Sequence, residues 1–136
     1  MNSYTKYKQQ FPYYAPVVLR LGIAAVVIWF GTSQLLDQAM WTSFIPDWAI
    51  ALTHLSATTL VILNGLFEVI AATLVAYGVC VRPLAFLLFL HMCGIVSTIG
   101  LSATGVRDIA VAVGLLSVSL YGNDIFSWKY QPSQNV

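Results

Sequence analysis

Four long apolar runs dominate the chain, and polar stretches containing proline or glycine separate them. A helix needs about 20 residues to cross the roughly 30 Å hydrocarbon core of a bilayer. The pattern therefore predicts four membrane-spanning helices, at about residues 15–36, 57–81, 83–101 and 106–126. Consecutive spans joined by short connections usually pack as antiparallel neighbours. We therefore expect an all-α fold, an up-and-down bundle of four transmembrane helices in which residues 1–136 form one membrane domain.

Composition supports lipid as the solvent of this bundle. Hydrophobic residues make up 59% of the chain, charged residues only 8%, and the mean hydropathy is +0.80. Soluble domains carry roughly a quarter of their residues as charges, which is far more than this chain has for a water-facing surface. The net charge of +1 and the lack of a basic tract give no reason to expect nucleic acid as a partner.

The outer loop, residues 37–56, is the one sizeable segment between the predicted spans. Pro46 and Asp47 form a helix-start signal, and Trp48, Leu52 and Leu55 then share one helical face. The segment is predicted to be a short interfacial helix or an extension of the second span. Amphipathic segments of this kind usually seat a protein in the interface, and a substrate lid is the alternative.

Lysine and arginine predict the orientation of the bundle, because short cytoplasmic loops are enriched in both. With the N-terminus inside, Lys6, Lys8, Arg82 and Lys129 lie on the inner side and Arg107 lies on the outer side. The reverse orientation would invert this ratio. We predict a multi-pass protein of the cell membrane with both termini cytoplasmic.

Ionisable residues inside the spans are the candidates for function, since a charge at mid-membrane costs several kcal/mol unless partners or water satisfy it. Glu68 lies near the midplane, and Asn64 lies one turn earlier on the same face. His91, on the next span, has a depth within reach of Glu68. A Glu–His pair can pass protons or hold a polar head group, whereas the alternative is a structural hydrogen bond between helices. These residues are too few for a metal ion, and we predict no metal site.

Arg20, Arg107 and Asp108 are the remaining candidates. Arg20 lies about one turn inside the first span, where it either snorkels to the inner surface or turns inward toward Glu68. A direct bridge to Glu68 would need a helix tilt. Asp108 is expected in the first turn of the fourth span, where it would complement the helix dipole. Arg107 beside it could hold an anionic or carbonyl-bearing ligand.

A series of short motifs follows the same order as the predicted spans. They are Arg20-Leu21-Gly22, Trp29-Phe30-Gly31, Phe44-Ile45-Pro46, Asn64-Gly65-Leu66-Phe67-Glu68, Gly78-Val79-Cys80-Val81-Arg82 and Gly105-Val106-Arg107-Asp108. Their order and spacing, together with the helix count, resemble the DoxX family of small four-helix membrane proteins from about Val17 to Gly122. The family often has a lysine shortly after the glycine that ends the first helix, and Gln34 stands nearest that place here.

The resemblance implies a redox association, because some relatives look like membrane subunits of oxidoreductase systems, including the small subunit of a thiosulfate:quinone oxidoreductase. We therefore expect a redox-associated subunit in which Glu68, His91 and Arg20 line a polar pocket for a quinone-like head group. The chain has no haem, flavin or iron–sulfur motif. It would be at most a membrane subunit of an oxidoreductase, with quinone as its one candidate cofactor. A membrane-bound or soluble oxidoreductase or a second copy of the chain would be its protein partner.

Two other functions stay open. The first is a structural or assembly partner of a membrane complex, without chemistry of its own. The second is a small proton-coupled transporter. Small four-helix exporters typically carry their membrane carboxylate in the first helix, whereas here the first span has Arg20 and the carboxylate is Glu68 in the second. The transporter is therefore the least favoured of the three.

Overall fold

Four long helices form the body of the molecule in the computed structural model, which describes residues 11–128. They are α2 (Phe11–Leu36), α5 (Ala57–Ala76), α6 (Val81–Ile99) and α7 (Ala103–Tyr121). Each is long and apolar enough to cross a membrane. No strand occurs among the residues that the structure describes. The predicted all-α, four-helix fold is therefore confirmed.

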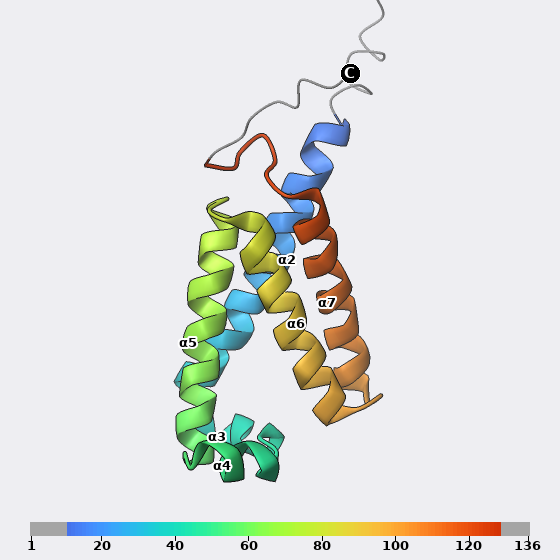
Figure 1. The fold of residues 1–136 in the computed structure, drawn as a ribbon. Coiled ribbons are helices and arrows are strands. Elements are labelled where there is room, and N and C mark those ends of the chain that lie inside the picture. The colour runs from blue at the N-terminus through green and yellow to red at the C-terminus, as the bar shows by residue number, and fades with distance from the viewer. Residues whose placement is uncertain (1–10, 129–136) are drawn as a thin grey trace, which may run out of the picture.

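The helices associate as two pairs, α2 with α5 and α6 with α7, and smaller α5–α6 and α2–α7 contacts join the pairs (Figure 1). Small and β-branched side chains fill the core, since close approach between membrane helices favours small residues. The buried core consists of Ala24, Val27, Ala71, Ala72, Val75, Val81, Ala85, Leu88, Met92, Val111, Ala112, Leu115 and Val118.

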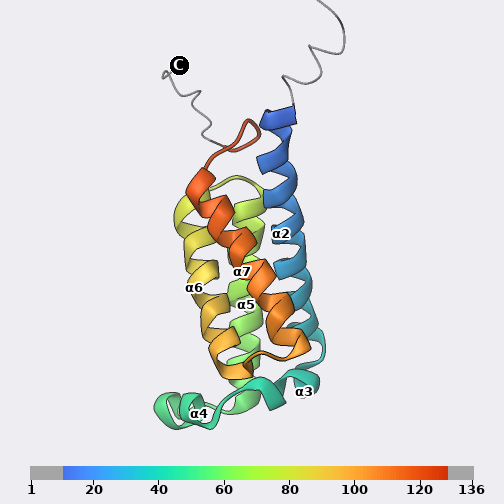
Figure 2. The ribbon, with the colours of Figure 1, turned by 90° about the vertical axis from the view of Figure 1, so that its right-hand side faces the viewer.

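The bundle has two distinct ends (Figure 2). The start of α2, the turn between α5 and α6, and residues 122–128 lie together at what we call the terminal end. The connection between α2 and α5 and the connection between α6 and α7 lie at the opposite end, the loop end. Lys6, Lys8 and Lys129, which contribute to the predicted orientation, lie outside the described residues.

A contact between two glycines holds α2 against α5. A Cβ atom added at Gly31 would lie 2.8 Å from the carbonyl oxygen of Gly65, and one added at Gly65 would lie 2.8 Å from that of Gly31. Such a distance is too short for any side chain, so the two backbones approach as closely as glycine alone permits. Gly22 of α2, in contrast, faces open space, because a Cβ atom there would meet nothing within 4 Å.

The helix ends differ from the predicted bounds where capping residues intervene. The second span was expected to reach residue 81, but α5 ends at Ala76 because Gly78 (φ +77°) and Cys80 (φ +47°) adopt left-handed conformations in the following turn. The fourth span was expected at 106–126. Instead, Ser102 caps α7 through a 3.0 Å hydrogen bond from the Gly105 amide, and the helix ends at Tyr121, before Gly122 (φ +84°).

The outer loop contains three short helical segments, α3 (Gln38–Trp41), the 3₁₀ helix η1 (Thr42–Phe44) and α4 (Asp47–Thr53). The expected short helix after Pro46 is therefore present. It does not extend α5, because His54 ends α4 in a left-handed conformation and Ser56 starts a new helix as its N-cap. Trp48 and Leu52 are largely exposed on α4, as an interfacial helix requires.

We predict that Gly65→Ala destabilises the fold by about 1–3 kcal/mol, the usual cost of overfilling a packed contact. The added methyl group would push against the Gly31 carbonyl and force α2 and α5 apart. Thermal unfolding in detergent, followed by circular dichroism, measures the effect. Gly22→Ala is the matched control and should melt at or slightly above the wild-type temperature, because its methyl group meets no neighbour. Equal melting of Gly65→Ala and wild type would contradict the assigned contact.

Candidate functional site

Glu68 is the centre of a polar cluster formed by Gln34, Asn64, Glu68 and His91. Its carboxylate accepts hydrogen bonds from the side-chain amides of Gln34 (2.8 Å) and Asn64 (3.1 Å), and His91 Nε2 lies 3.1 Å from Oε1. Asn64 also donates to the side-chain oxygen of Gln34 at 2.8 Å. The cluster thus links α2, α5 and α6 through one buried carboxyl group, which is only 2% exposed.

The spacing of Asn64 and Glu68 explains why these two side chains of the cluster lie together. Residues four apart lie on one face of a helix, so both side chains point from α5 toward the bundle interior. Gln34 reaches the pair because α2 approaches α5 closely at Gly31 and Gly65, one turn away. His91 is positioned by an edge-to-face contact with the Phe67 ring, with ring centroids 5.1 Å apart. Within residues 11–128, every buried polar side-chain atom has a hydrogen-bond partner.

A cavity of about 460 Å³ lies between the polar cluster and the loop end. All four residues of the cluster line it, as do Arg107 and Asp108. Its remaining walls are mainly apolar and aromatic, with rings from α2 and the outer loop: Phe30, Trp41, Phe44 and Trp48. The structure therefore brings the predicted candidates together in one cavity, with the exception of Arg20.

Arg107 and Asp108 lie at the loop end of this cavity as a pair, with Arg107 Nε 2.9 Å from Asp108 Oδ1. The guanidinium carbon of Arg107 also lies 4.4 Å from the centroid of the Phe30 ring, a cation–π contact that joins α7 to α2. The expected dipole role of Asp108 is wrong, because α7 begins at Ala103 and Asp108 falls beyond its first turn. Asp108 is instead a buried partner of the half-exposed Arg107.

Arg20 belongs to a different site, at the terminal end. It neither snorkels to the surface nor contacts Glu68: its side chain is 2% exposed, and its Nε lies 2.6 Å from Asp124 Oδ2. It also donates to the backbone carbonyls of Val75 (2.9 Å) and Ala76. The inward orientation considered for Arg20 is therefore present, but the expectation that it lines a pocket with Glu68 and His91 is wrong.

Asp124 is held on several sides in the segment that follows α7. It accepts hydrogen bonds from Arg20, the Phe126 amide (3.0 Å) and the Ser127 hydroxyl (3.3 Å). Burial alone would raise the pKa of Asp124, but these hydrogen bonds and the Arg20 charge outweigh it and hold the pKa below its ordinary value of 3.8. The segment packs over the α5–α6 turn, where Ser127 fills the space above Gly78.

Gln34 and Asp124 are the two participants that sequence reasoning did not identify as candidates. Gln34 was noted only as the residue nearest the family's lysine position. Its signal is its place three residues after Gly31, one turn along α2. Asp124 offered a weaker signal, since it and Arg20 are opposite charges expected near the same membrane boundary on the last and first spans.

The described residues do not bring three or more His, Cys, Asp or Glu side chains close enough together to hold a metal ion. In comparisons with known proteins, the DoxX family model matches residues 15–101, a stretch that includes the whole polar cluster. No curated protein and no solved structure gives a significant match.

We predict that Asp124→Asn destabilises the protein by about 3–5 kcal/mol, because it leaves the Arg20 charge buried without its carboxylate. The pH dependence provides a second measurement. Since the folded-state pKa of Asp124 is depressed, its stabilisation is complete above pH 3.8 and is lost as the pH falls through the folded-state pKa. When the melting temperature is measured as a function of pH, the wild type should lose this stabilisation at acidic pH, and Asp124→Asn should not. The exposed Asp47 provides a control, and Asp47→Asn should retain the acid-induced loss.

Proposed function

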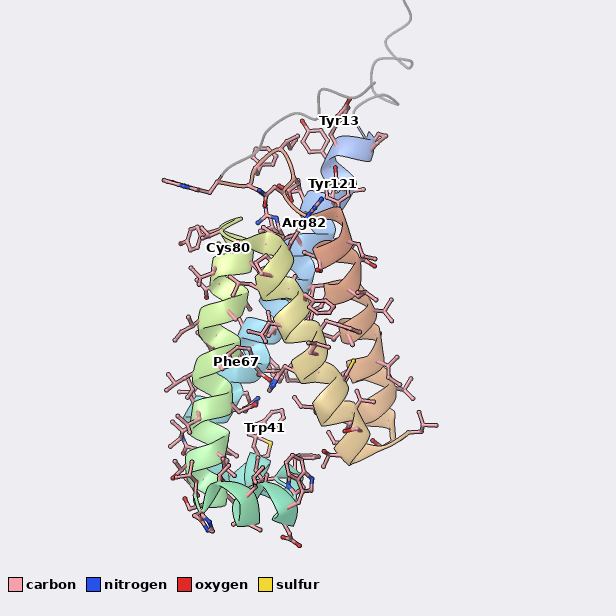
Figure 3. The ribbon with its side chains drawn as sticks, in the orientation of Figure 1. Tyr13, Trp41, Phe67, Cys80, Arg82 and Tyr121 are labelled. Carbon is pink, nitrogen blue, oxygen red and sulfur yellow. The ribbon has the colours of Figure 1, made fainter. Side chains whose placement is uncertain are left out.

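The chain belongs to the DoxX family, and from this premise we propose that it is a membrane subunit of a redox system whose cavity receives a quinone-like head group. Its family and its four apolar helices make it a multi-pass integral membrane protein. In the proposed orientation, the protein lies in the cell membrane and its terminal end faces the cytoplasm. The exposed Arg82 at that end supports this orientation (Figure 3).

The observation that carries the proposal is the combination of a polar floor and aromatic walls in one cavity. A quinone head group is a flat ring whose carbonyl oxygens accept hydrogen bonds. The rings of Phe30, Trp41, Phe44 and Trp48 offer apolar surfaces for such a ring, and a few converging polar groups would fix its orientation. His91 is the most suitable donor. It lines the cavity, and only its Nε2 has a hydrogen-bond partner among residues 11–128.

The Glu68–His91 contact gives the site its chemistry. Reduction of a quinone to a hydroquinone takes up electrons and protons in equal number. His91 can donate a proton to a carbonyl oxygen and recover it from the Glu68 carboxyl group 3.1 Å away. The proposal assigns electron transfer to a partner oxidoreductase, either soluble or membrane-bound. This chain would bind the head group and exchange its protons.

A second candidate, a structural or assembly subunit, rests on a different observation. Every buried polar side-chain atom in the described part of the chain is already hydrogen-bonded, which is what a purely structural cluster requires. In that case Glu68 would join α2, α5 and α6, and the exposed surfaces would contact other subunits of a complex.

Ligand-dependent thermal stability distinguishes the two functions. We predict that a short-chain benzoquinone raises the melting temperature of the purified wild type. At a ligand concentration 100-fold above Kd, it should increase the free energy of unfolding by about 2.7 kcal/mol. Glu68→Gln and His91→Phe keep the side-chain size but remove the proton-exchanging pair, so both should lose most of this increase. Asp124→Asn is the control for general weakening, because it should lower the basal melting temperature and still show the ligand-dependent increase.

A wild type that quinone does not stabilise would contradict quinone binding. If Glu68→Gln then also melted at a lower temperature than wild type, the polar cluster would be structural. The assembly function would then replace quinone binding as the proposed function.

A further inference from the structure

The walls of the cavity are closed in most directions, and the direction that stays open identifies the kind of ligand. Between α2 and α5, the contact of Gly31 with Gly65 leaves no passage, since even a single Cβ atom would clash there. Between α2 and α7, Arg107 lies over the Phe30 ring at 4.4 Å. The α6–α7 pair packs along its whole length, with Gly105 directly against the Gly100 carbonyl at the loop end.

The two ends of the cavity are also covered. Toward the terminal end, the buried side chains of Ala72, Val75, Ala85 and Leu88 fill the space between α5 and α6. At the loop end, the outer loop lies across the cavity. Trp41 fastens it to α2 by a 3.2 Å hydrogen bond to Ser33 and by edge-to-face stacking on Phe30.

The remaining direction is between α5 and α6. The two helices leave their turn side by side and diverge toward the loop end (Figure 1). From α5, Phe67 reaches the His91 ring of α6 near the middle of the bundle, and Trp41 lies nearer the loop end (Figure 3). Four residues of α6 both line the cavity and are exposed: Leu90, Gly94, Ser97 and Thr98. The cavity therefore opens sideways, at a depth where the surrounding medium is lipid.

We propose that the ligand of this cavity carries an apolar tail and enters from the membrane between α5 and α6, with its head group on the polar cluster and its tail passing out beside Gly94. This inference rests on the proposed function for the head group and adds the route and the tail. A polar head group would replace the contacts it loses with water by contacts with His91 and the cavity rings. The tail would remain in hydrocarbon throughout, so no apolar surface would need to cross the aqueous phase.

Gly94 is the position that keeps this opening free. It lines the cavity, and a Cβ atom added there would meet nothing within 4 Å. A larger side chain at this position would therefore project into the opening without pushing any neighbouring helix. Gly22 is its matched counterpart. It is also a helical glycine with nothing within 4 Å, and it lines neither this cavity nor the smaller one beside Arg20.

The test compares Gly94→Leu, Gly22→Leu and the wild type in lipid nanodiscs. Two probes share one benzoquinone ring, of which one carries a decyl tail and the other has none. We expect Gly94→Leu to weaken binding of the tailed probe at least about fivefold, the low end of what overfilling an apolar site costs. Binding of the tailless probe should change by no more than about twofold in the same variant, since the polar cluster is untouched. Gly22→Leu should bind both probes as the wild type does.

Three other results would overturn the inference, and they separate its failure from that of the proposed function. Equal binding of both probes to Gly94→Leu and wild type would rule out the α5–α6 route and leave the head-group site standing. Equal weakening of both probes would show that the head group itself occupies the space at Gly94, which contradicts the assigned tail path. Failure of the wild type to bind either probe would reject the proposed function and the inference together.

Discussion

A buried carboxyl group inside a membrane must find all its hydrogen-bond partners within the protein, and this constraint organises the whole bundle. Glu68 satisfies it with Gln34, Asn64 and His91, which come from three different helices. Just beyond the spans, at the terminal end, the buried Asp124 is paired with Arg20, whose remaining donors bind the last carbonyls of α5. Each carboxyl group therefore fixes the relative depth of the helices that contact it. Apolar packing in a lipid environment constrains that depth only weakly.

The two clusters lie on opposite sides of the apolar core and play different parts. The Arg20–Asp124 pair is an ion pair with almost no exposed surface, and it ties the segment after α7 to α2 and α5. The Glu68 cluster has two partly exposed members, Asn64 and His91, which both line the cavity. Loss of either member of a fully enclosed pair destabilises the fold, and such a pair is poorly placed for exchange with a ligand. The cluster with an accessible imidazole has the access that ligand binding or proton exchange needs.

The sequence allowed the four helices, their bundle and the Asn64–Glu68–His91 association to be predicted, because apolar run length and helical spacing determine these directly. It did not allow the partner of Arg20 to be predicted, because the end of α7 depends on Gly122 and on a compact turn around Asp124 that helical periodicity does not describe. Gln34 was missed for a related reason. Its approach to Glu68 depends on the Gly31–Gly65 contact, which is a property of two helices together. Its place one turn after Gly31 therefore does not by itself identify Gln34 as a partner of Glu68.

The α5–α6 turn has a mechanical consequence for the far side of the molecule. Gly78 and Cys80 hold left-handed conformations there, and Ser127 packs against Gly78, so the angle between the two helices is set at the terminal end. Helix α5 has 20 residues, or about 30 Å of length at 1.5 Å per residue. A small rotation at the turn is therefore amplified along the length of α5. A few degrees of rotation at Gly78 would displace the loop-end tips of the helices by ångströms, so the width of the cavity is governed by residues that never touch it.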